Sequence, residues 1–160
     1  MLFRSSNFKD YTKLITGNFI FRHRTQGVGY LTKESAISLG CTGPVARASG
    51  VQCDIRKLYP YDGYDKLDFK EITNPGCDSW ARYFVRMEEM KQSIHIIEQL
   101  LDNFPEGESR TKLKGVLRVP AGEYYQRVET ARGELGVFMV SDGSTKPYRL
   151  KYRTPCFSNL

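Results

Sequence analysis

The chain has 160 residues, of which 40% are hydrophobic and 26% charged, and its formal net charge is +6 at pH 7. That length fits one globular domain with a sizeable core, and the composition is typical of soluble proteins. No apolar run approaches the ~18 residues needed to span a bilayer, so we expect a soluble or membrane-peripheral chain. Basic residues interleave with acids and accompany no recognition motif, so we expect no nucleic-acid partner.

The four cysteines argue against a metal centre. They stand at positions 41, 53, 77 and 156, without a Cys-x-x-Cys pair or a nearby pair of histidines. This spacing fits neither a zinc site nor a four-thiolate iron–sulfur site, so we expect no metal. Reduced, mostly buried thiols in a cytosolic compartment are the simpler interpretation. No Ser-His-Asp or Cys-His pattern and no phosphate-binding loop is visible, so we assign no catalytic residue.

The first elements in chain order are short. Residues 7–16 carry apolar side chains on one side of a predicted helix that Gly17 closes. Residues 19–21 are interpreted as an apolar plug that leads into a basic segment, and residues 27–31 as an extended piece. Thr32 is the expected N-cap of the next helix, which Gly40 ends.

Residues 42–50, with the sequence TGPVARASG, surround a single cation with small residues. Glycine and other small residues let backbones pack closely around one long side chain, here that of Arg47. Two interpretations stay open at this point. The segment is either a tight turn in which Arg47 caps carbonyl groups, or a loop near a polar ligand.

The stretch 78–103 is the strongest helix prediction. Asp78 is the expected N-cap, and Pro105 and Gly107 end the helix. Glu88 and Glu89 point about 100° apart on a helix, so we expect them to be solvated or salt-bridged rather than a catalytic pair. Large apolar residues recur at steps of three and four, and we expect this stripe to be buried, contributing about 10 kcal/mol gross. The stripe comprises Trp80, Tyr83, Phe84, Met87, Met90, Ile94, Ile97 and Leu101.

The last forty residues predict a three-stranded antiparallel sheet, so the fold class is α+β with a long central helix. Residues 124–130 are strand-like, and residues 135–140 are apolar on both faces, as in a strand covered on both sides. Asp142-Gly143 is a hairpin signal, and residues 148–153 alternate between apolar and basic. The charged turn Arg132-Gly133-Glu134 joins the first two strands, and we expect function there.

Ordered motifs then carry a family resemblance from position 16 to position 160. They include Arg24-Thr25-Gln26-Gly27, Thr42-Gly43-Pro44, Arg86-Met87-Glu88-Glu89-Met90, Arg132-Gly133-Glu134-Leu135-Gly136 and Ser141-Asp142-Gly143-Ser144. Taken together, they resemble the 49-kDa or D subunit of respiratory complex I, the quinone-site subunit of proton-pumping NADH:quinone oxidoreductase. The resemblance implies a fragment of the nickel–iron hydrogenase large-subunit-like fold. Residues 7–160 would be a partial domain truncated at both ends, and residues 1–6 a non-native or disordered N-terminus.

The resemblance also implies a site. Arg132 matches the hydrogenase arginine that overhangs the metal, so Arg132, Gly133 and Glu134 would lie beside the quinone cavity that replaces the metal. Arg47 is the fourth candidate. The family's histidine and tyrosine that bond the quinone headgroup lie upstream of this sequence. Quinone would be the substrate, and FMN and iron–sulfur clusters would belong to partner subunits, above all the iron–sulfur subunit bordering the site. The expected location is peripheral, on the cytoplasmic face of the bacterial inner membrane.

Two alternatives remain at this stage. A large subunit of a membrane-bound nickel–iron hydrogenase would need two Cys-x-x-Cys pairs in flanking sequence. A scaffold or docking fragment without its own activity would use the same loops only to contact other subunits. We expect the chain alone to be inactive and poorly soluble, because surfaces meant for its partners would be bare.

Overall fold

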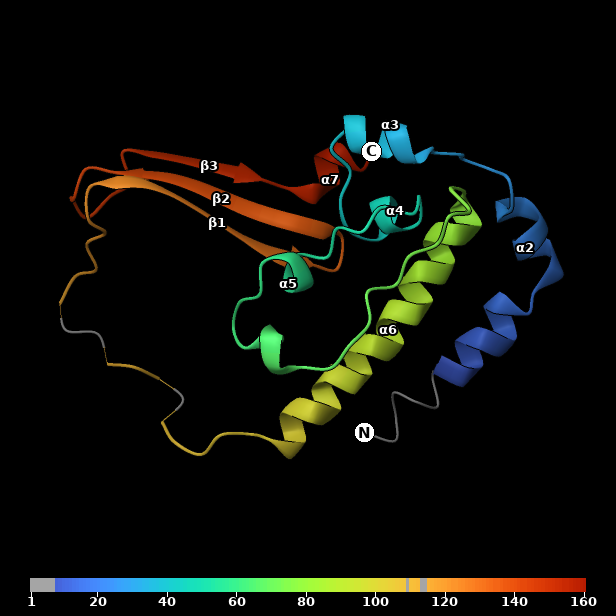
Figure 1. The fold of residues 1–160 in the computed structure, drawn as a ribbon, viewed down its shortest axis with the longest axis horizontal. Coiled ribbons are helices and arrows are strands. Elements are labelled where there is room, and N and C mark those ends of the chain that lie inside the picture. Colours follow the sequence, from blue (N-terminus) through green and yellow to red (C-terminus); the bar gives the residue numbers. More distant parts are fainter. Residues whose placement is uncertain (1–7, 109, 113–114) are drawn as a thin grey trace.

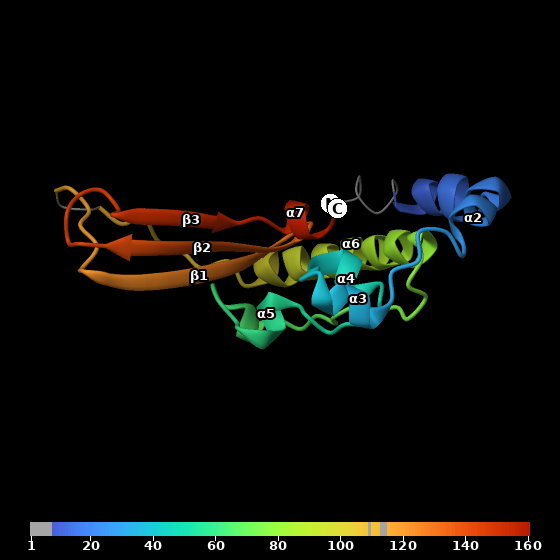
Figure 2. The same ribbon diagram turned by 90° about the horizontal axis from the view of Figure 1, so that it is seen from above.

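The computed structural model describes residues 8–108, 110–112 and 115–160 (Figure 1). The expectation for residues 1–6 lies outside the described residues. The two longest elements are the helix α6 (Ser79–Asp102) and a three-stranded sheet, which diverge from a junction occupied by short helices (Figure 1). Viewed from above, the short helices α3 (Lys33–Ser38) and α5 (Ile55–Leu58) lie on one side of the layer formed by the sheet and α6 (Figure 2).

Helix α6 begins as predicted, but it buries a different face. The Asp78 carboxylate caps it by accepting a hydrogen bond from the Ala81 N–H at 2.7 Å. Ala81 and Val85 are buried against the chain around Ala48, because their small size lets that backbone approach closely. The predicted burial of the whole stripe is therefore wrong. Its exposed members are Phe84, Met90 and Leu101.

Two helices precede this core at the N-terminus. The predicted helix over 7–16 is confirmed over its described residues, 8–16, with a π-helical turn, η1, over Thr12–Thr16. Residues 19–21, interpreted as an apolar plug, begin the helix α2 (Phe19–Thr25), and Phe19 and Ile20 are exposed, so that interpretation is wrong. Its N-cap is Asn18, whose side-chain oxygen accepts hydrogen bonds from two N–H groups of the first turn. Phe21 of α2 meets Tyr83 of α6 edge to face at 4.9 Å.

The middle of the chain supplies three more helices. Thr32 caps α3, as predicted. The segment 42–50 contains a helix, α4 (Gly43–Arg47), which begins with Pro44 in its first turn, so its interpretation as a simple turn or loop is wrong. Helix α5 is followed by a 3₁₀ turn, η2, over Tyr64–Lys66. A small core joins α3 to α4. It is formed by Ala36, Cys41, Val45 and Ala46, with Leu31, Val51 and Cys53 packed against it.

The predicted antiparallel sheet is confirmed. Strands β1 (Gly122–Thr130), β2 (Gly133–Ser141) and β3 (Arg149–Arg153) pair in the order β1-β2-β3, with Thr130 opposite Gly133 at the turn. Most side chains of β2 are half-buried, so the expectation that it is covered on both sides is not met within this chain. A last short helix, α7 (Pro155–Ser158), returns the chain to the junction.

Neither a membrane span nor a metal-binding group is found in the described ranges. None of their helices is long and apolar enough to cross a bilayer. Nor do three His, Cys, Asp or Glu side chains gather there as metal ligands would. All four cysteines are free thiols, and Cys156 is exposed, in contrast to the buried Cys41 and Cys77.

Candidate functional site

The β1–β2 turn is held against the start of α4 by two glycines. Gly43 (φ +67°) and Gly133 (φ +126°) approach so closely that a Cβ on Gly43 would lie 2.6 Å from the Gly133 nitrogen. Conversely, a Cβ on Gly133 would lie 2.6 Å from the Thr42 Oγ1. Glycine is required at both positions, because both the backbone angle and the close approach exclude a side chain.

Hydrogen bonds from three residues outside the turn, Thr42, Arg153 and Asn159, fix the same turn. The Thr42 hydroxyl accepts hydrogen bonds from the Glu134 N–H at 3.1 Å and from the Arg153 guanidinium at 3.0 Å. Arg153 also donates to the Glu134 carbonyl at 2.7 Å. The Asn159 amide donates to the Arg132 carbonyl at 2.9 Å and accepts from the Thr42 N–H at 3.1 Å. The turn is therefore a rigid platform, assembled from β1–β2, α4, β3 and the end of the chain.

The Arg132 side chain projects from this platform toward solvent. Its guanidinium donates to the Cys156 sulfur at 3.3 Å, and it forms no salt bridge with a carboxylate of the described residues. The hydrogen bond lowers the pKa of the Cys156 thiol and raises the pKa of Arg132, because it favours the thiolate beside the cation. Arg132 is thus an exposed cation on a braced backbone, and the Cys156 sulfur is the hydrogen-bond partner of its guanidinium among the described residues.

Glu134, next in the turn, is already paired. Its carboxylate accepts a hydrogen bond from the Tyr125 hydroxyl at 2.9 Å and lies 3.7 Å from the Arg127 guanidinium. Arg127 in turn stacks over the Tyr59 ring, 3.7 Å from its centroid. The arrangement orients the carboxylate along the sheet face.

Arg47 lies behind the turn, in the interior. It is 1% exposed, and its guanidinium bridges Glu89 of α6 (2.6 Å) and Glu129 of β1 (2.9 Å). Burial alone would lower the pKa of Arg47, but the two carboxylates outweigh that effect and raise it, so Arg47 stays charged. This pair confirms that Glu89 is salt-bridged. Arg47 therefore connects the long helix to the hairpin that carries the turn.

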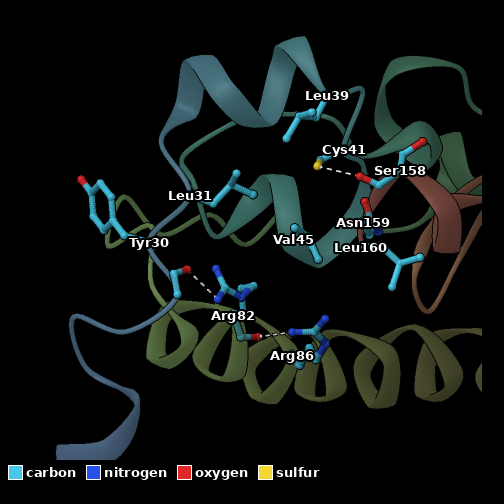
Figure 3. Close-up of a pocket in the computed structure, with 11 residues that line it drawn as sticks. Tyr30, Leu31, Leu39, Cys41, Val45, Arg82, Arg86, Ser158, Asn159 and Leu160 are labelled. Carbon is cyan, nitrogen blue, oxygen red and sulfur yellow. Dashed lines mark hydrogen bonds between the residues drawn. The ribbon is translucent and has the colours of Figure 1, made fainter.

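A cavity of about 500 Å³ opens beside the turn, between α3, α4, α6 and the end of the chain (Figure 3). Asn159, which holds the Arg132 carbonyl, lines one side of it. Arg82 and Arg86 of α6 line the opposite side, where Arg82 donates to the Gly29 carbonyl at 2.8 Å and Arg86 to the Arg82 carbonyl at 2.8 Å. The wall also includes apolar residues. They are Leu31, Leu39, Val45 and Leu160.

Comparison with known proteins places the chain in a family. The family model for the respiratory-chain NADH dehydrogenase 49 Kd subunit matches residues 3–117 and 111–160. The chain belongs to this family. The resemblance inferred from the motifs is thereby confirmed.

Individual relatives support the same family assignment. The C/D subunit of the NADH-quinone oxidoreductase of Bacteroides fragilis is 56% identical over 145 residues, covering 91% of this chain and 27% of that protein. The D subunit of the NADH-quinone oxidoreductase of Desulforamulus reducens is 45% identical over 152 residues, covering 95% of this chain and 42% of that protein. The D subunit of the F(420)H(2) dehydrogenase of Methanosarcina mazei is 51% identical over 158 residues (95% and 42%). The chain thus spans less than half the length of each of these relatives.

A solved structure supports the fold. A chain of the membrane-bound sulfane sulfur reductase, an archaeal respiratory membrane complex, superposes with a TM-score of 0.89 at 39% identity. The match covers 98% of the present chain and 43% of the reductase chain. The α+β prediction, with a long helix and a small antiparallel sheet, is confirmed.

The structure brings three of the four predicted site residues together and separates the fourth. Arg132, Gly133 and Glu134 share one turn, whereas Arg47 is enclosed behind it and reaches the turn through Glu129. Arg82 and Arg86 line the cavity, and sequence reasoning did not include them among the site residues. Arg82 and Arg86 stand four residues apart on the predicted helix and therefore share one face, and this spacing was the signal that could have identified them.

Proposed function

We propose that this chain forms one wall of the quinone-reduction site in a proton-translocating NADH:quinone oxidoreductase. Its family membership supports the complex, and the braced Arg132 turn supports the site. In this proposal Arg132, Gly133 and Glu134 border the quinone, and Arg47 holds their support in place. Quinone is the substrate, and FMN and iron–sulfur clusters are bound by partner subunits.

The single observation that carries the proposal is the Arg132 guanidinium. It stands on a rigid backbone and has no carboxylate partner among the described side chains. Reduction places negative charge on a quinone, and a guanidinium presented by a braced turn would stabilise that charge. Gly133 keeps the turn tight against α4, and the contacts with Tyr125 and Arg127 fix the orientation of the Glu134 carboxylate.

The partners follow from the same proposal. The chain would contact other subunits of the complex, above all the iron–sulfur subunit across the quinone cleft. It would lie at the cytoplasmic face of the bacterial inner membrane as a peripheral component. The relatives include subunits of both NADH-quinone oxidoreductases and an F(420)H(2) dehydrogenase, so we assign no electron-donor site to this chain.

The test is Arg132→Ala in the complete subunit within its assembled complex. We expect quinone reduction to fall by about 10²-fold, as for loss of one charge-stabilising group, with partial recovery in Arg132→Lys. Electron transfer from NADH to an artificial acceptor that bypasses quinone should be unchanged. The exposed Arg118→Ala provides a matched control for the loss of one surface cation. Unchanged quinone reduction and quinone KM in Arg132→Ala would assign Arg132 to the scaffold.

A further inference from the structure

The third strand of the sheet carries a row of cations on one face. Arg149, Lys151 and Arg153 occupy alternate positions of β3, and they line a cavity of about 410 Å³. Tyr125 of β1 and Phe138 of β2 line the same cavity and stand in one cross-strand row with Lys151. Because alternate residues of a strand are about 6.6 Å apart, the cations extend over about 13 Å.

The row has no carboxylate partner within the described part of the chain. Arg149 and Lys151 are exposed and form no salt bridge there. Arg153 is held by neutral oxygens, because it donates to the Thr42 hydroxyl and to two backbone carbonyls. The two exposed cations are therefore available to a group from outside.

Acids on the same face of the sheet do not neutralise the row. By the strand register these acids are Glu123, Glu129 and Glu134. Glu129 and Glu134 already have guanidinium partners elsewhere on the molecule. Glu123 lies two strands from Arg149 in the same cross-strand row, so about 10 Å separates their backbones. Salt screens exposed charges over about 8 Å at physiological ionic strength, so this attraction is weak.

The opposite face of β3 is apolar and also uncovered. Leu150 is 43% exposed and Tyr152 is 64% exposed, and they stand opposite Met139 and Val137 of β2. Exposed apolar side chains that gather on one face, beside charged ones, are typical of surfaces that contact a partner.

The outer edge of β3 is open as well. The strand is the last in the order β1-β2-β3, and no other described segment runs along its outer side in either view (Figure 1, Figure 2). An unpaired strand edge offers backbone N–H and C=O groups to a further strand. A strand added there would place its alternate side chains directly opposite those of β3.

We propose that β3 docks an extended segment of a partner subunit, which pairs with its open edge and presents carboxylates at alternate positions to Arg149 and Lys151. The intervening side chains of that segment are apolar and lie against Leu150 and Tyr152. An anionic lipid headgroup would meet the cations but would use neither the apolar face nor the backbone edge. A protein strand of this pattern uses all three features.

This inference rests on the proposed function only in that the chain works within a complex of several subunits. It names a surface and the chemistry of the segment that covers it, and it holds wherever quinone binds.

Carbodiimide cross-linking of the assembled complex, with the complete subunit in place, tests the proposal. The reagent joins a lysine amine directly to a carboxylate in contact with it. We expect mass spectrometry to find Lys151 linked to an Asp or Glu of another subunit, with a second acid two residues away in that segment. Lys91, whose Nζ lies 2.6 Å from Glu88, is the positive control. Lys146, exposed in the adjoining hairpin, should not be linked to that segment.

Two cross-linking results would overturn the proposal. One is the absence of a link at Lys151 in samples where the Lys91–Glu88 link forms. The other is a link from Lys151 to an acid of the same subunit. Neither result involves quinone reduction, so failure of this proposal and failure of the quinone-site proposal are distinguishable.

Charge reversal gives a second measurement. Lys151→Glu in the complete subunit should lower the fraction of subunit found in the assembled complex several-fold, because like charges would then face each other across the added strand. Lys146→Glu should leave that fraction unchanged. Both positions are exposed, so the melting temperature of the free subunit should change little in either variant. Unchanged assembly in Lys151→Glu, with loss of binding to phosphatidylglycerol vesicles, would show that the row binds lipid headgroups and that the proposal is wrong.

Discussion

Gly43 and Gly133 meet backbone to backbone, so that α4 and the β1–β2 turn touch with no side chain between them. A Cβ on Gly43 would lie 2.6 Å from the Gly133 nitrogen and 2.7 Å from the Arg132 carbonyl oxygen. This contact, together with the ion pair between Arg47 and Glu129, attaches α4 to the hairpin at both ends of the short helix.

Gly43→Ala should therefore destabilise the chain more than its backbone angle alone requires. Gly40 is a matched control, because its φ of +68° is nearly that of Gly43 (+67°) while nothing lies within 4 Å of an added Cβ. We expect about 1 kcal/mol of lost unfolding free energy in Gly40→Ala from the left-handed backbone, and about 1–3 kcal/mol more in Gly43→Ala from overpacking. Denaturant unfolding measures both. Equal losses of unfolding free energy in Gly40→Ala and Gly43→Ala would show that the β1–β2 turn moves away from α4 at no cost.

The buried ion pairs give a second stability prediction. Arg47→Met leaves Glu89 and Glu129 enclosed without their cation, which should cost about 3–5 kcal/mol of unfolding free energy. Lys91→Met breaks the Glu88–Lys91 pair, whose lysine is 46% exposed, and should cost about 0.5 kcal/mol or less. The comparison is made by chemical denaturation at neutral pH. A loss in Arg47→Met as small as that in Lys91→Met would mean that the cluster relaxes or hydrates.

Local signals in the sequence were sufficient to predict where the main elements begin and end. Asp78 caps α6 because its short carboxylate reaches the free N–H groups of the first turn, a pattern visible in sequence. The alternation over 148–153 and the Asp142-Gly143 signal likewise predicted the sheet, because strand periodicity and turn chemistry act over a few residues.

Contacts between distant parts of the chain were beyond sequence reasoning. Arg47 meets partners 42 and 82 residues away, so its enclosure could not be inferred from the small residues beside it. The stripe on α6 was misjudged for a related reason. Large residues such as Phe84 and Met90 were expected inside, but close packing against Ala48 selects Ala81 and Val85 instead.

The Asp54–Arg56 pair predicts a specific acid sensitivity. The hydrogen bonds and charge of Arg56 outweigh the effect of burial and lower the pKa of Asp54. A carboxylate with a depressed folded pKa stabilises the native state above its unfolded pKa of about 3.9, and this contribution is lost as pH falls through the folded pKa. Asp54→Asn should therefore lower stability at neutral pH and flatten its decline below about pH 4. Thermal melts across acidic pH measure the effect, and an unchanged acid slope would contradict it.

The Arg132–Cys156 contact predicts that Cys156 is the most reactive thiol of the chain. It is exposed, and the hydrogen bond from Arg132 lowers its pKa, whereas burial raises the pKa of Cys53 to about 11. Because the thiolate is the reactive form, iodoacetamide should modify Cys156 first at neutral pH. In Arg132→Ala the rate at Cys156 should fall several-fold while the rate at Cys53 stays unchanged. Mass spectrometry of timed reactions measures both rates, with Arg118→Ala as the control for lost surface charge. An unchanged modification rate at Cys156 in Arg132→Ala would show that exposure alone governs the reactivity of this thiol, and that the guanidinium does not favour the thiolate in the folded chain.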